Sequence, residues 1–563
     1  MDEYEGAEAF VEILNTYHVD NIFFNPGVDT VPVQVAVSKL TAAGNRAPKL
    51  ILCLDESVAM SAAHGHYMAS GKPQVVMVHA ELGTMQVGGA LHNAQWGRVP
   101  VILWAGLLPQ GNRADWLHEP YDQSNIVRNC VKWAHHLDSG ENIHDILQQG
   151  FKTALTEPRG PVYLSYSLEI LTKTIEKRLI EPPNGDAVLS TTQADLEKIA
   201  RILIDADKPL ILTGYTGRYH ESVASLVELA ETLSAPVLSG STRMNFPTTH
   251  PLFGGRGQIG GRGRTTPYVA NADVILVIDY DTPYVSGGVP KPDTQIIHID
   301  IDALTQGRQL WGKEADIFIK DDSRIIIPAL KKIISQMISQ GKPELFRERW
   351  RQLEFDHNEQ RHKSRDMAMN KAEQKPISPD WLCRCISEVI DEDTIILNQT
   401  ISHSASVAEQ IDRTQPGTLL ACAGGSIQWA LGASLGTKLA SPQSTVVNLV
   451  TDGGFVWGCP VATLWSAVSY KAPFLSIIFN NQSYGAIRGL VQRAYGEYIL
   501  SDEMAFDVGV DIAPPPDYAS IARDCGAYGL MVEDPADVLP ALRDAISQVR
   551  SGKPTVVDVR LSK

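Results

Sequence analysis

The sequence predicts an α/β protein made of three domains, each built on a doubly wound parallel sheet. Three observations support this prediction. The chain has 563 residues, which is too long for a single hydrophobic core. Short apolar segments bounded by Gly or Pro alternate with amphipathic segments along most of the chain. The alternation falls into three blocks of comparable size, residues 1–178, 193–340 and 379–563.

The first block opens with a helix and continues with buried strands. Apolar residues recur at the helical period over 7–19, and residues 21–27 are typical of a strand that enters a turn. Residues 73–79 and 99–106 are short apolar segments typical of buried strands. Buried strands separated by helices predict a parallel sheet that is covered on both faces. From Arg178 onward the periodicity is lost and Pro, Gly, Ser and Thr accumulate, which predicts a linker.

The second and third blocks repeat this pattern. Between them, residues 340–378 are rich in Arg, Lys, Glu and Gln and predict a solvated helix and connector. The strand-like segments are 208–214, 234–240, 272–280 and 294–302 in the second block and 393–399, 444–454, 474–485 and 554–562 in the third.

Composition excludes several classes of partner. A net charge of −16 argues against nucleic acid, because a protein that binds a polyanion needs a basic face. The apolar segments are short and interrupted, so no membrane span is expected, and the acidic start of the chain does not resemble a secretory signal. Seven scattered cysteines suit a reducing compartment. We therefore expect a cytoplasmic protein.

Oxygen-bearing side chains follow two predicted strands of the third block. Asp452 follows one strand, and Asn480 and Asn481 end another, with one apolar helix between them. Carboxylate and amide oxygens suit Mg²⁺, and the glycines after Asp452 would let backbone N–H groups approach a phosphate at the start of a helix. The same spacing also fits a helix cap at Asp452 and a turn at the Asn pair. Spacing alone leaves both interpretations open.

This Asp-Gly, helix, Asn-Asn arrangement resembles the signature of thiamin-diphosphate enzymes, although Thr451 stands where that family usually has Gly. The resemblance implies that Asp452, Asn481 and the backbone carbonyl of Ser483 bind Mg²⁺. It also implies that Gly453, Gly454 and Tyr484 contact the cofactor. On this basis residues 1–178 are the pyrimidine-binding domain, 193–340 the central domain and 379–563 the diphosphate-binding domain.

Two further segments resemble the same family. Glu56 follows a strand and opens a helix of small residues, and its family counterpart hydrogen-bonds the aminopyrimidine of the cofactor. In the segment that begins at Ala423, Gly425 and Ile427 match residues whose backbone groups contact the pyrimidine, and the Ile427 side chain would bend the cofactor. Each segment alone also fits a structural role, Glu56 as compensation of a helix dipole. Three motifs in the family's order favour the cofactor site.

Other residues resemble particular members of the family. His79 and the sequence Asn25, Pro26, Gly27 resemble benzoylformate decarboxylase, in which a His at this place moves protons on the bound intermediate. A second active-site His of that enzyme has no clear counterpart here, and His118 is the candidate substitute. Residues 235–255 and 294–302 resemble acetolactate synthase. That family often holds FAD, but residues 279–284 replace the Arg-containing segment usual there, so FAD is not expected.

An NAD site is a weaker alternative. Gly255, Gly257 and Gly260 have the spacing of a dinucleotide fingerprint, but the residues before them do not read as the strand that such a fingerprint requires.

The sequence therefore predicts an enzyme that uses thiamin diphosphate and Mg²⁺ to cleave or form a carbon–carbon bond next to a carbonyl. We expect a 2-oxo acid decarboxylase with carboligase ability, acting on a small 2-oxo acid or aldehyde. The alternative is an acetolactate-synthase-like transferase that condenses two 2-oxo acids. A cofactor-binding regulatory subunit without activity is disfavoured by the presence of Glu56. In the family Glu56 and Asp452 meet across a subunit interface, which implies a homodimer or homotetramer. The particular 2-oxo acid stays open.

Overall fold

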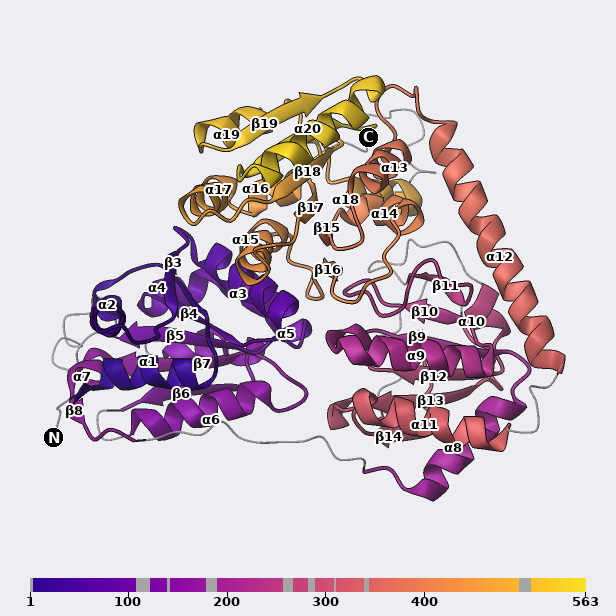
Figure 1. The fold of residues 1–563 in the computed structure, drawn as a ribbon, viewed down its shortest axis with the longest axis horizontal. Helices are drawn as coiled ribbons and strands as arrows, with labels where there is room; N and C mark the ends of the chain where they lie inside the picture. Colours follow the sequence, from indigo (N-terminus) through magenta and orange to yellow (C-terminus); the bar gives the residue numbers. More distant parts are fainter. Residues whose placement is uncertain are drawn as a thin grey trace.

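The computed structural model describes residues 4–107, 122–138, 142–178, 190–256, 267–281, 289–307, 310–338, 344–495 and 508–562. Within these ranges the chain forms three α/β domains, each around a six-stranded parallel sheet, as predicted. The three domains lie at the corners of a triangle, with the N-terminal and central domains below the C-terminal one (Figure 1). None of the helices in these ranges is long and apolar enough to cross a membrane.

The N-terminal sheet has the strand order β3-β2-β4-β5-β7-β6. All five residues of β4 are buried, as expected for a strand covered on both faces. Because the strands are parallel, the segments that follow β2, β4 and β5 meet at one edge of the sheet. The strands are β2 (Asn21–Phe24), β3 (Lys49–Leu52), β4 (Gln74–Val78), β5 (Val101–Leu107), β6 (Trp133–Leu137) and β7 (Val162–Ser167). The helices are α1 (Gly6–Thr16), α2 (Val31–Ala42), α3 (Glu56–Ser70), α4 (Ala80–Gln86), α5 (Gly88–Trp96), α6 (Ile143–Leu155) and α7 (Leu168–Thr172), with η1 (Val28–Thr30) before α2. A short antiparallel pair, β1 (Tyr4–Glu5) and β8 (Thr174–Ile175), joins the two ends of the domain.

The C-terminal sheet has the order β16-β15-β17-β18-β20-β19. Numbered within each domain, this order and that of the N-terminal sheet are both 2-1-3-4-6-5, so the two domains share a topology. The strands are β15 (Ile395–Gln399), β16 (Leu419–Ala421), β17 (Val446–Thr451), β18 (Leu475–Asn480), β19 (Tyr528–Val532) and β20 (Thr555–Arg560). The helices are α13 (Pro379–Val389), α14 (Ser404–Gln410), α15 (Ala430–Ala440), α16 (Asp452–Trp457), α17 (Pro460–Ser469), α18 (Gly485–Tyr495), α19 (Tyr518–Asp524) and α20 (Val538–Arg550).

The central sheet differs, with the order β11-β10-β9-β12-β13-β14, or 3-2-1-4-5-6 within the domain. The strands are β9 (Pro209–Thr213), β10 (Val237–Ser239), β11 (Phe253–Arg256), β12 (Val274–Ile278), β13 (Gln295–Asp300) and β14 (Ile317–Lys320). The helices are α8 (Gln193–Asp205), α9 (His220–Leu233), α10 (Pro267–Asn271) and α11 (Ser323–Met337). One detail of the sequence interpretation is wrong: the residues at Gly255 do form a strand, the edge strand β11.

The predicted solvated connector is confirmed as helix α12 (Glu344–Met369), which has 26 residues. Its buried residues are Phe346, Leu353, Ser364 and Ala368, and the rest of its surface is largely polar. The helix runs along the outside of the molecule from the central domain to the C-terminal domain (Figure 1).

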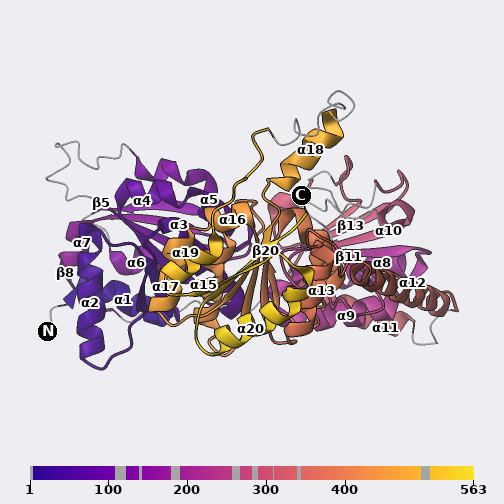
Figure 2. The same ribbon diagram turned by 90° about the horizontal axis from the view of Figure 1, so that it is seen from above.

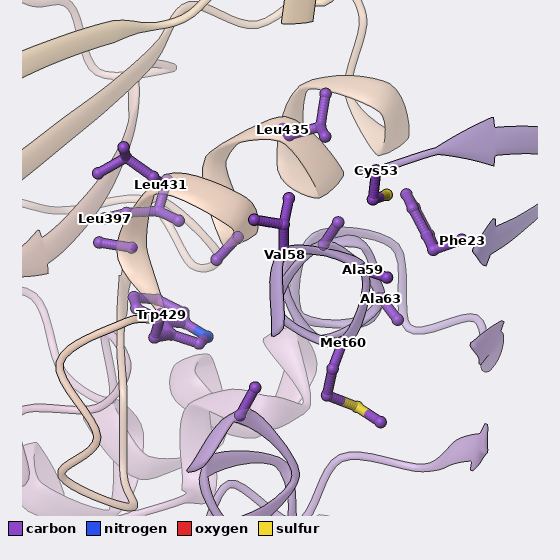
Figure 3. Packing of buried hydrophobic residues seen from close by; sticks show 14 of the residues in the cluster. Phe23, Cys53, Val58, Ala59, Met60, Ala63, Leu397, Trp429, Leu431 and Leu435 are labelled. Carbon is purple, nitrogen blue, oxygen red and sulfur yellow. The ribbon is translucent and has the colours of Figure 1, made fainter. Parts of the chain in front are cut away.

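The N- and C-terminal domains share one hydrophobic core through the crossing of α3 and α15. Val58 of α3 lies between the two helices (Figure 3), and a Cβ at Gly432 of α15 would lie 3.0 Å from its carbonyl oxygen. Small residues let the backbones approach closely: a Cβ at Gly65 would overlap the backbone of Ala433, and one at Gly436 would overlap that of Ala62. The crossing therefore sets the distance between the start of α3 and the loop before α15.

Candidate active site

The predicted metal ligands come together at the ends of two neighbouring strands. β17 and β18 pair directly, with Thr451 opposite Phe479. Asp452 follows β17, and Asn481 and Ser483 follow β18, and all three are buried. Backbone N–H groups of Gln482 and Ser483 lie close enough to the Asp452 carboxylate to lower its pKa. The structure thus brings the three residues into one cluster.

The buried carboxylate of Asp452 has few hydrogen-bond donors to stabilise its negative charge. Its Oδ1 accepts a hydrogen bond from the backbone N–H of Gly453 at 2.7 Å. Its Oδ2 is buried, and no donor among the described residues reaches it. Burial raises the pKa of Asp452 to about 6, and the backbone N–H groups of Gly453, Gln482 and Ser483 offset only part of this effect. A buried carboxylate oxygen without a donor is suited to ligate a cation.

The other two predicted ligands also present oxygen atoms. The Asn481 Oδ1 accepts from the backbone N–H of Ser483 at 3.3 Å. The carbonyl of Ser483 accepts from the backbone N–H of Gly485 at 2.8 Å and keeps a second lone pair. Between them, Gln482 adopts a left-handed conformation with φ of 54°, which turns the chain back toward Asp452. The donor set of a carboxylate, an amide oxygen and a carbonyl fits Mg²⁺.

Thr451, the departure from the family pattern, caps helix α16. Its Oγ1 accepts from the backbone N–H of Gly454 at 3.1 Å. Asp452 is the first residue inside the helix. The alternative in which Asp452 is the helix cap is therefore wrong, because Thr451 fills that role and leaves the Asp452 carboxylate to the cluster at the strand ends.

The loop before α15 lies against the start of α16. A Cβ at Gly454 would lie 3.6 Å from the carbonyl oxygen of Ile427, so the two segments nearly touch. Gly425 has φ of 84° and no atom near its Cβ position, which leaves open space on that side of the loop. Its left-handed backbone is one that a non-glycine residue would adopt only with strain. The loop can therefore present backbone groups to a ligand.

Tyr484 lies over the glycines of α16. A Cβ at Gly453 would be 3.4 Å from its ring, and its hydroxyl accepts from the Trp457 Nε1 at 3.1 Å. Helix α18 begins at the next residue, Gly485, and stands out from the body of the molecule (Figure 2).

Glu56 is the first residue of α3, and Asp55 before it caps the helix. The Asp55 Oδ1 accepts from the backbone N–H groups of Ser57 and Val58 at 2.8 and 3.1 Å. Because Asp55 caps the helix, Glu56 is not required for that purpose. Its half-buried side chain lies against α4, where a Cβ at Gly83 would be 3.3 Å from Glu56 Oε1.

His79 ends β4 and precedes α4. Its ring is 24% exposed, and its Nδ1 lies 2.6 Å from Oδ1 of Asp29. The segment of Asn25, Pro26 and Gly27 follows the neighbouring strand β2, and Gly27 lies directly beside the His79 ring. The structure thus brings His79 next to the segment predicted to accompany it. His118 lies outside the described residues.

Hydrogen bonds that the sequence does not predict hold the loop before α15, and we call them the Asn93 clamp. Asn93 of α5 donates from Nδ2 to the carbonyl of Ser426 at 2.9 Å, and the backbone N–H of Ser426 donates to Asn93 Oδ1 at 3.0 Å. Gln399 at the end of β15 donates to the same carbonyl at 3.2 Å. No local sequence signal reveals the contact between Asn93 and Ser426, because the two residues are 333 positions apart.

A second missed contact supports the metal-ligand segment. Asn480 donates from Nδ2 to Oδ1 of Asp558 on β20 at 2.8 Å, and Asp558 is fully buried. Burial raises the pKa of Asp558 to about 6. The pair fixes the residue that precedes Asn481.

The strand ends of the central domain carry acidic residues that pair with arginines. Asp279 forms an ion pair with Arg218 at 2.8 Å, and Arg98 of the N-terminal domain pairs with Asp281 and Asp300 at 2.5 and 3.1 Å. Nucleotides bind at such strand ends in sheets of this order. The absence of FAD stays a prediction.

The structure has three α/β domains, of which the N- and C-terminal ones share a topology, and comparison with known families identifies the class of protein. Residues 4–126 match the N-terminal thiamine pyrophosphate binding domain of thiamine pyrophosphate enzymes, 196–330 their central domain and 401–559 their C-terminal thiamine pyrophosphate binding domain. The chain belongs to the thiamin-diphosphate-dependent enzymes.

Its relatives have more than one activity. The chain is 25% identical to benzoylformate decarboxylase of Pseudomonas aeruginosa, over 98% of both chains. It is 23% identical to the acetolactate synthase isozyme 3 large subunit of Escherichia coli, over 99% of this chain and 95% of that one. The fold is similar to that of the thiamine diphosphate-dependent 4-hydroxybenzoylformate decarboxylase of Rhodococcus jostii, with a TM-score of 0.79, 22% identity and 99% of each chain covered.

Proposed function

We propose that this enzyme decarboxylates a small 2-oxo acid with the help of thiamin diphosphate and Mg²⁺, and that it can join the resulting fragment to an aldehyde. The observation that carries this proposal is the placement of His79 beside Asn25, Pro26 and Gly27 in the same domain as Glu56. A full-length relative named benzoylformate decarboxylase supports the choice of reaction.

The cofactor would be held by the C-terminal domain. Asp452, Asn481 and the carbonyl of Ser483 would ligate Mg²⁺, and the backbone of Gly453 and Gly454 would face the diphosphate. Gly425 and Ile427 would contact the pyrimidine. When bound, thiamin diphosphate supplies the electron sink that allows a bond next to a carbonyl carbon to break.

The N-terminal domain would supply the proton-transfer groups. Glu56 would exchange a proton with the aminopyrimidine before any substrate binds. His79 would move a proton on the substrate-derived group later, because imidazole is suited to proton transfer near neutral pH. The two side chains therefore act at different stages.

Product analysis distinguishes the proposal from its alternative. Holoenzyme would be incubated with a panel of 2-oxo acids, with and without added aldehydes, and the products identified by NMR. We expect carbon dioxide and an aldehyde from one 2-oxo acid, and a hydroxyketone when an aldehyde acceptor is present. A 2-hydroxy-3-oxo acid, formed from two 2-oxo acids, would instead identify an acetolactate-synthase-like transferase, which the relative from Escherichia coli keeps as the second candidate.

A variant of His79 tests its role. His79→Ala should leave cofactor activation nearly unchanged and reduce aldehyde release by about 10²- to 10⁴-fold, the usual contribution of a proton-transfer group. If His79 only completes a strand, the variant will melt earlier and turn over normally per folded molecule. An unchanged rate in a stable variant would remove His79 from the mechanism.

We further propose that the active form is a homodimer or a pair of dimers. Exposed apolar side chains flank both halves of the site. Leu54 lies two residues before Glu56, and Leu82 and Met85 belong to α4, against which the Glu56 side chain lies. Val456 and Trp457 follow Asp452. Helix α17 exposes Val461, Trp465 and Val468 at helical spacing, so they form one apolar stripe. Apolar surface of this kind is usually covered, and a second copy of the chain would cover it.

Sedimentation of matched variants tests this assembly. Val461→Asp places a charge in the stripe on α17 and should shift the enzyme toward monomer with loss of activity. Leu304→Asp, an equally polar change at an exposed site of the central domain, should change neither. A fully active monomer would contradict the proposal.

A further inference from the structure

A buried carboxylate lies behind His79. Asp29 belongs to η1, the 3₁₀ turn that follows β2, and it is only 3% exposed. Its Oδ1 lies 2.6 Å from Nδ1 of His79. The hydroxyl of Tyr166, at the end of β7, donates to the backbone carbonyl of Asp29 at 3.0 Å. The carboxylate is thus fixed behind the ring by the ends of β2, β4 and β7.

Two glycines make room for this pair. A Cβ at Gly27 would overlap both the His79 ring and Oδ1 of Asp29, and a Cβ at Gly106 of β5 would overlap Oδ2 of Asp29. Side chains at either position would separate the carboxylate from the ring. The Asp29 Oδ2 is buried, and no hydrogen-bond donor in the described ranges reaches it.

We propose that Asp29 is a positioning residue that sets the tautomer and the orientation of His79. An ionised carboxylate can only accept hydrogen bonds, so the Nδ1 of His79 must carry the proton that they share. In the neutral ring Nε2 then carries no hydrogen and can only accept. This inference rests on the proposed role of His79, because the tautomer matters only if the ring moves a proton.

The proton balance follows from this tautomer. A proton that leaves the substrate-derived group moves to Nε2, while the Nδ1 proton stays between the ring and Asp29. The ring then carries one positive charge next to one negative charge. When Nε2 returns its proton, the ring regains its first state. Without Asp29 the neutral ring could hold its proton on Nε2 and would be unable to accept another there.

Nitrogen NMR of selectively labelled holoenzyme tests the tautomer without any substrate. In ¹⁵N-histidine enzyme, at a pH where the ring is neutral, the His79 signals should show a protonated Nδ1 and an unprotonated Nε2. The signals are assigned by their loss in His79→Gln. In Asp29→Asn the uncharged amide no longer enforces this state, so the Nε2-protonated tautomer should appear. A wild-type His79 protonated on Nε2 would overturn the proposal.

Kinetics of matched variants provide the second readout. Asp29→Asn should lower kcat for decarboxylation by about 10²-fold, at the lower end of a proton-transfer contribution, with little change in KM. The control is Asp321→Asn in the central domain, where the carboxylate is equally buried at 3% and accepts from Ser190 and Thr191. It should affect thermal stability but neither kcat nor the His79 signals. Wild-type kcat in stable Asp29→Asn holoenzyme would reject the role.

A double variant shows whether Asp29 acts through His79. Once His79 is alanine, Asp29→Asn should cause no further loss of turnover. A further loss would mean that Asp29 acts on something else and would overturn the proposal. The NMR measurement separates this outcome from failure of the proposed function: if wild-type enzyme converts no 2-oxo acid, the reaction is wrong, while the tautomer of His79 still decides the role of Asp29.

Discussion

Asp452 must be ionised to bind a cation, and its surroundings make ionisation costly. Its folded-state pKa is raised by burial to about 6, above its value near 3.9 in an unfolded chain. The unliganded protein therefore binds more protons than the unfolded chain between about pH 4 and 6, and this group lowers the stability as the pH rises through that window. Mg²⁺ bound at the proposed site would reverse this preference, because it would bind the ionised form of Asp452.

We therefore predict that binding of Mg²⁺ and thiamin diphosphate is pH-dependent. After correction for titration of the ligand itself, affinity should be level above about pH 7 and fall by up to about tenfold per unit below about pH 6. Calorimetry in buffers of different ionisation enthalpy should detect proton release at low pH. Asp558→Asn, which removes another buried carboxylate with a raised pKa, should keep this dependence. Equal affinity at pH 5 and pH 7 would show that Asp452 is not a ligand.

The carboxyl group of Glu56 is predicted to act on the cofactor alone. Glu56→Gln keeps the shape of the side chain but cannot exchange a proton, so hydrogen–deuterium exchange at the thiazolium carbon should slow by about 10²- to 10⁴-fold. Cofactor affinity should change little. Glu12→Gln on α1, which removes a surface contact to Lys177, is the control. Normal exchange in the Glu56 variant would contradict its assignment.

At the residue scale, the positions of the proposed site residues were predictable from the sequence, whereas the residues that hold them in place were not. Asp452, Asn481 and Glu56 each follow an apolar strand, so their place at a sheet edge is visible in the sequence. Asp29 also lies just past a strand, but its partner His79 is 50 positions away, and only the folded sheet places them together. The Asn93 clamp and the Asn480–Asp558 pair were missed for the same reason. Thr451 was noted in the sequence as a departure from the family pattern, and the structure explains it as the cap of helix α16.

At the scale of elements, strand and connector positions followed from hydrophobic pattern, whereas helix packing did not. The apolar runs gave the buried strands, and the polar segment after residue 340 gave α12. The crossing of α3 and α15 depends on small residues on both helices, including Gly65 and Gly436. Their meeting could not be read from either helix alone, because small residues also fit many other environments.

Gly436→Ala tests the importance of this crossing. The added Cβ would overlap the backbone of Ala62, which cannot move like a flexible side chain. We expect a loss of about 1 to 3 kcal/mol in the free energy of unfolding, as for overpacked cores. Cofactor affinity should also fall, because the crossing positions Glu56 relative to Gly425. Gly88→Ala on α5, where the Cβ meets open space, is the control and should be neutral or stabilising. Chemical denaturation and calorimetry measure both effects.

At the scale of the whole molecule, each pair of domains is joined by a different kind of contact. The N- and C-terminal domains share the hydrophobic core at α3 and α15. The central and C-terminal domains are joined by backbone hydrogen bonds from Met244 to Leu419 and from Ala421 to Thr242. Buried charges join the N-terminal and central domains, with Arg98 between Asp281 and Asp300. Each domain therefore contacts both of the others directly.

Of the three contacts between domains, the buried ion pairs of Arg98 should be the one at which a single substitution lowers stability most. Arg98 is 5% exposed and Asp300 is fully buried, so Arg98→Met would leave Asp300 buried without its counter-charge. Removing one partner of such a pair costs about 3 to 5 kcal/mol, whereas Arg201→Met, at an exposed pair with Glu197, should change stability by less than about 1 kcal/mol. Adding Asp300→Asn to Arg98→Met should restore part of the loss, because the uncompensated charge is then gone.

Arg98→Met also tests whether the contact between the N-terminal and central domains affects binding at the proposed cofactor site. Arg98 follows α5, and α5 carries Asn93, which holds Ser426 in the loop next to Gly425. If docking of the central domain steadies α5, Arg98→Met should weaken cofactor binding as well as stability, and Asp300→Asn should recover both together. The affinity for thiamin diphosphate should be measured well below the unfolding temperature, so that loss of binding is not caused by unfolding. Unchanged affinity in a destabilised Arg98→Met enzyme would mean that the α3–α15 core alone positions the loop, and that the central domain contributes to stability without shaping the site.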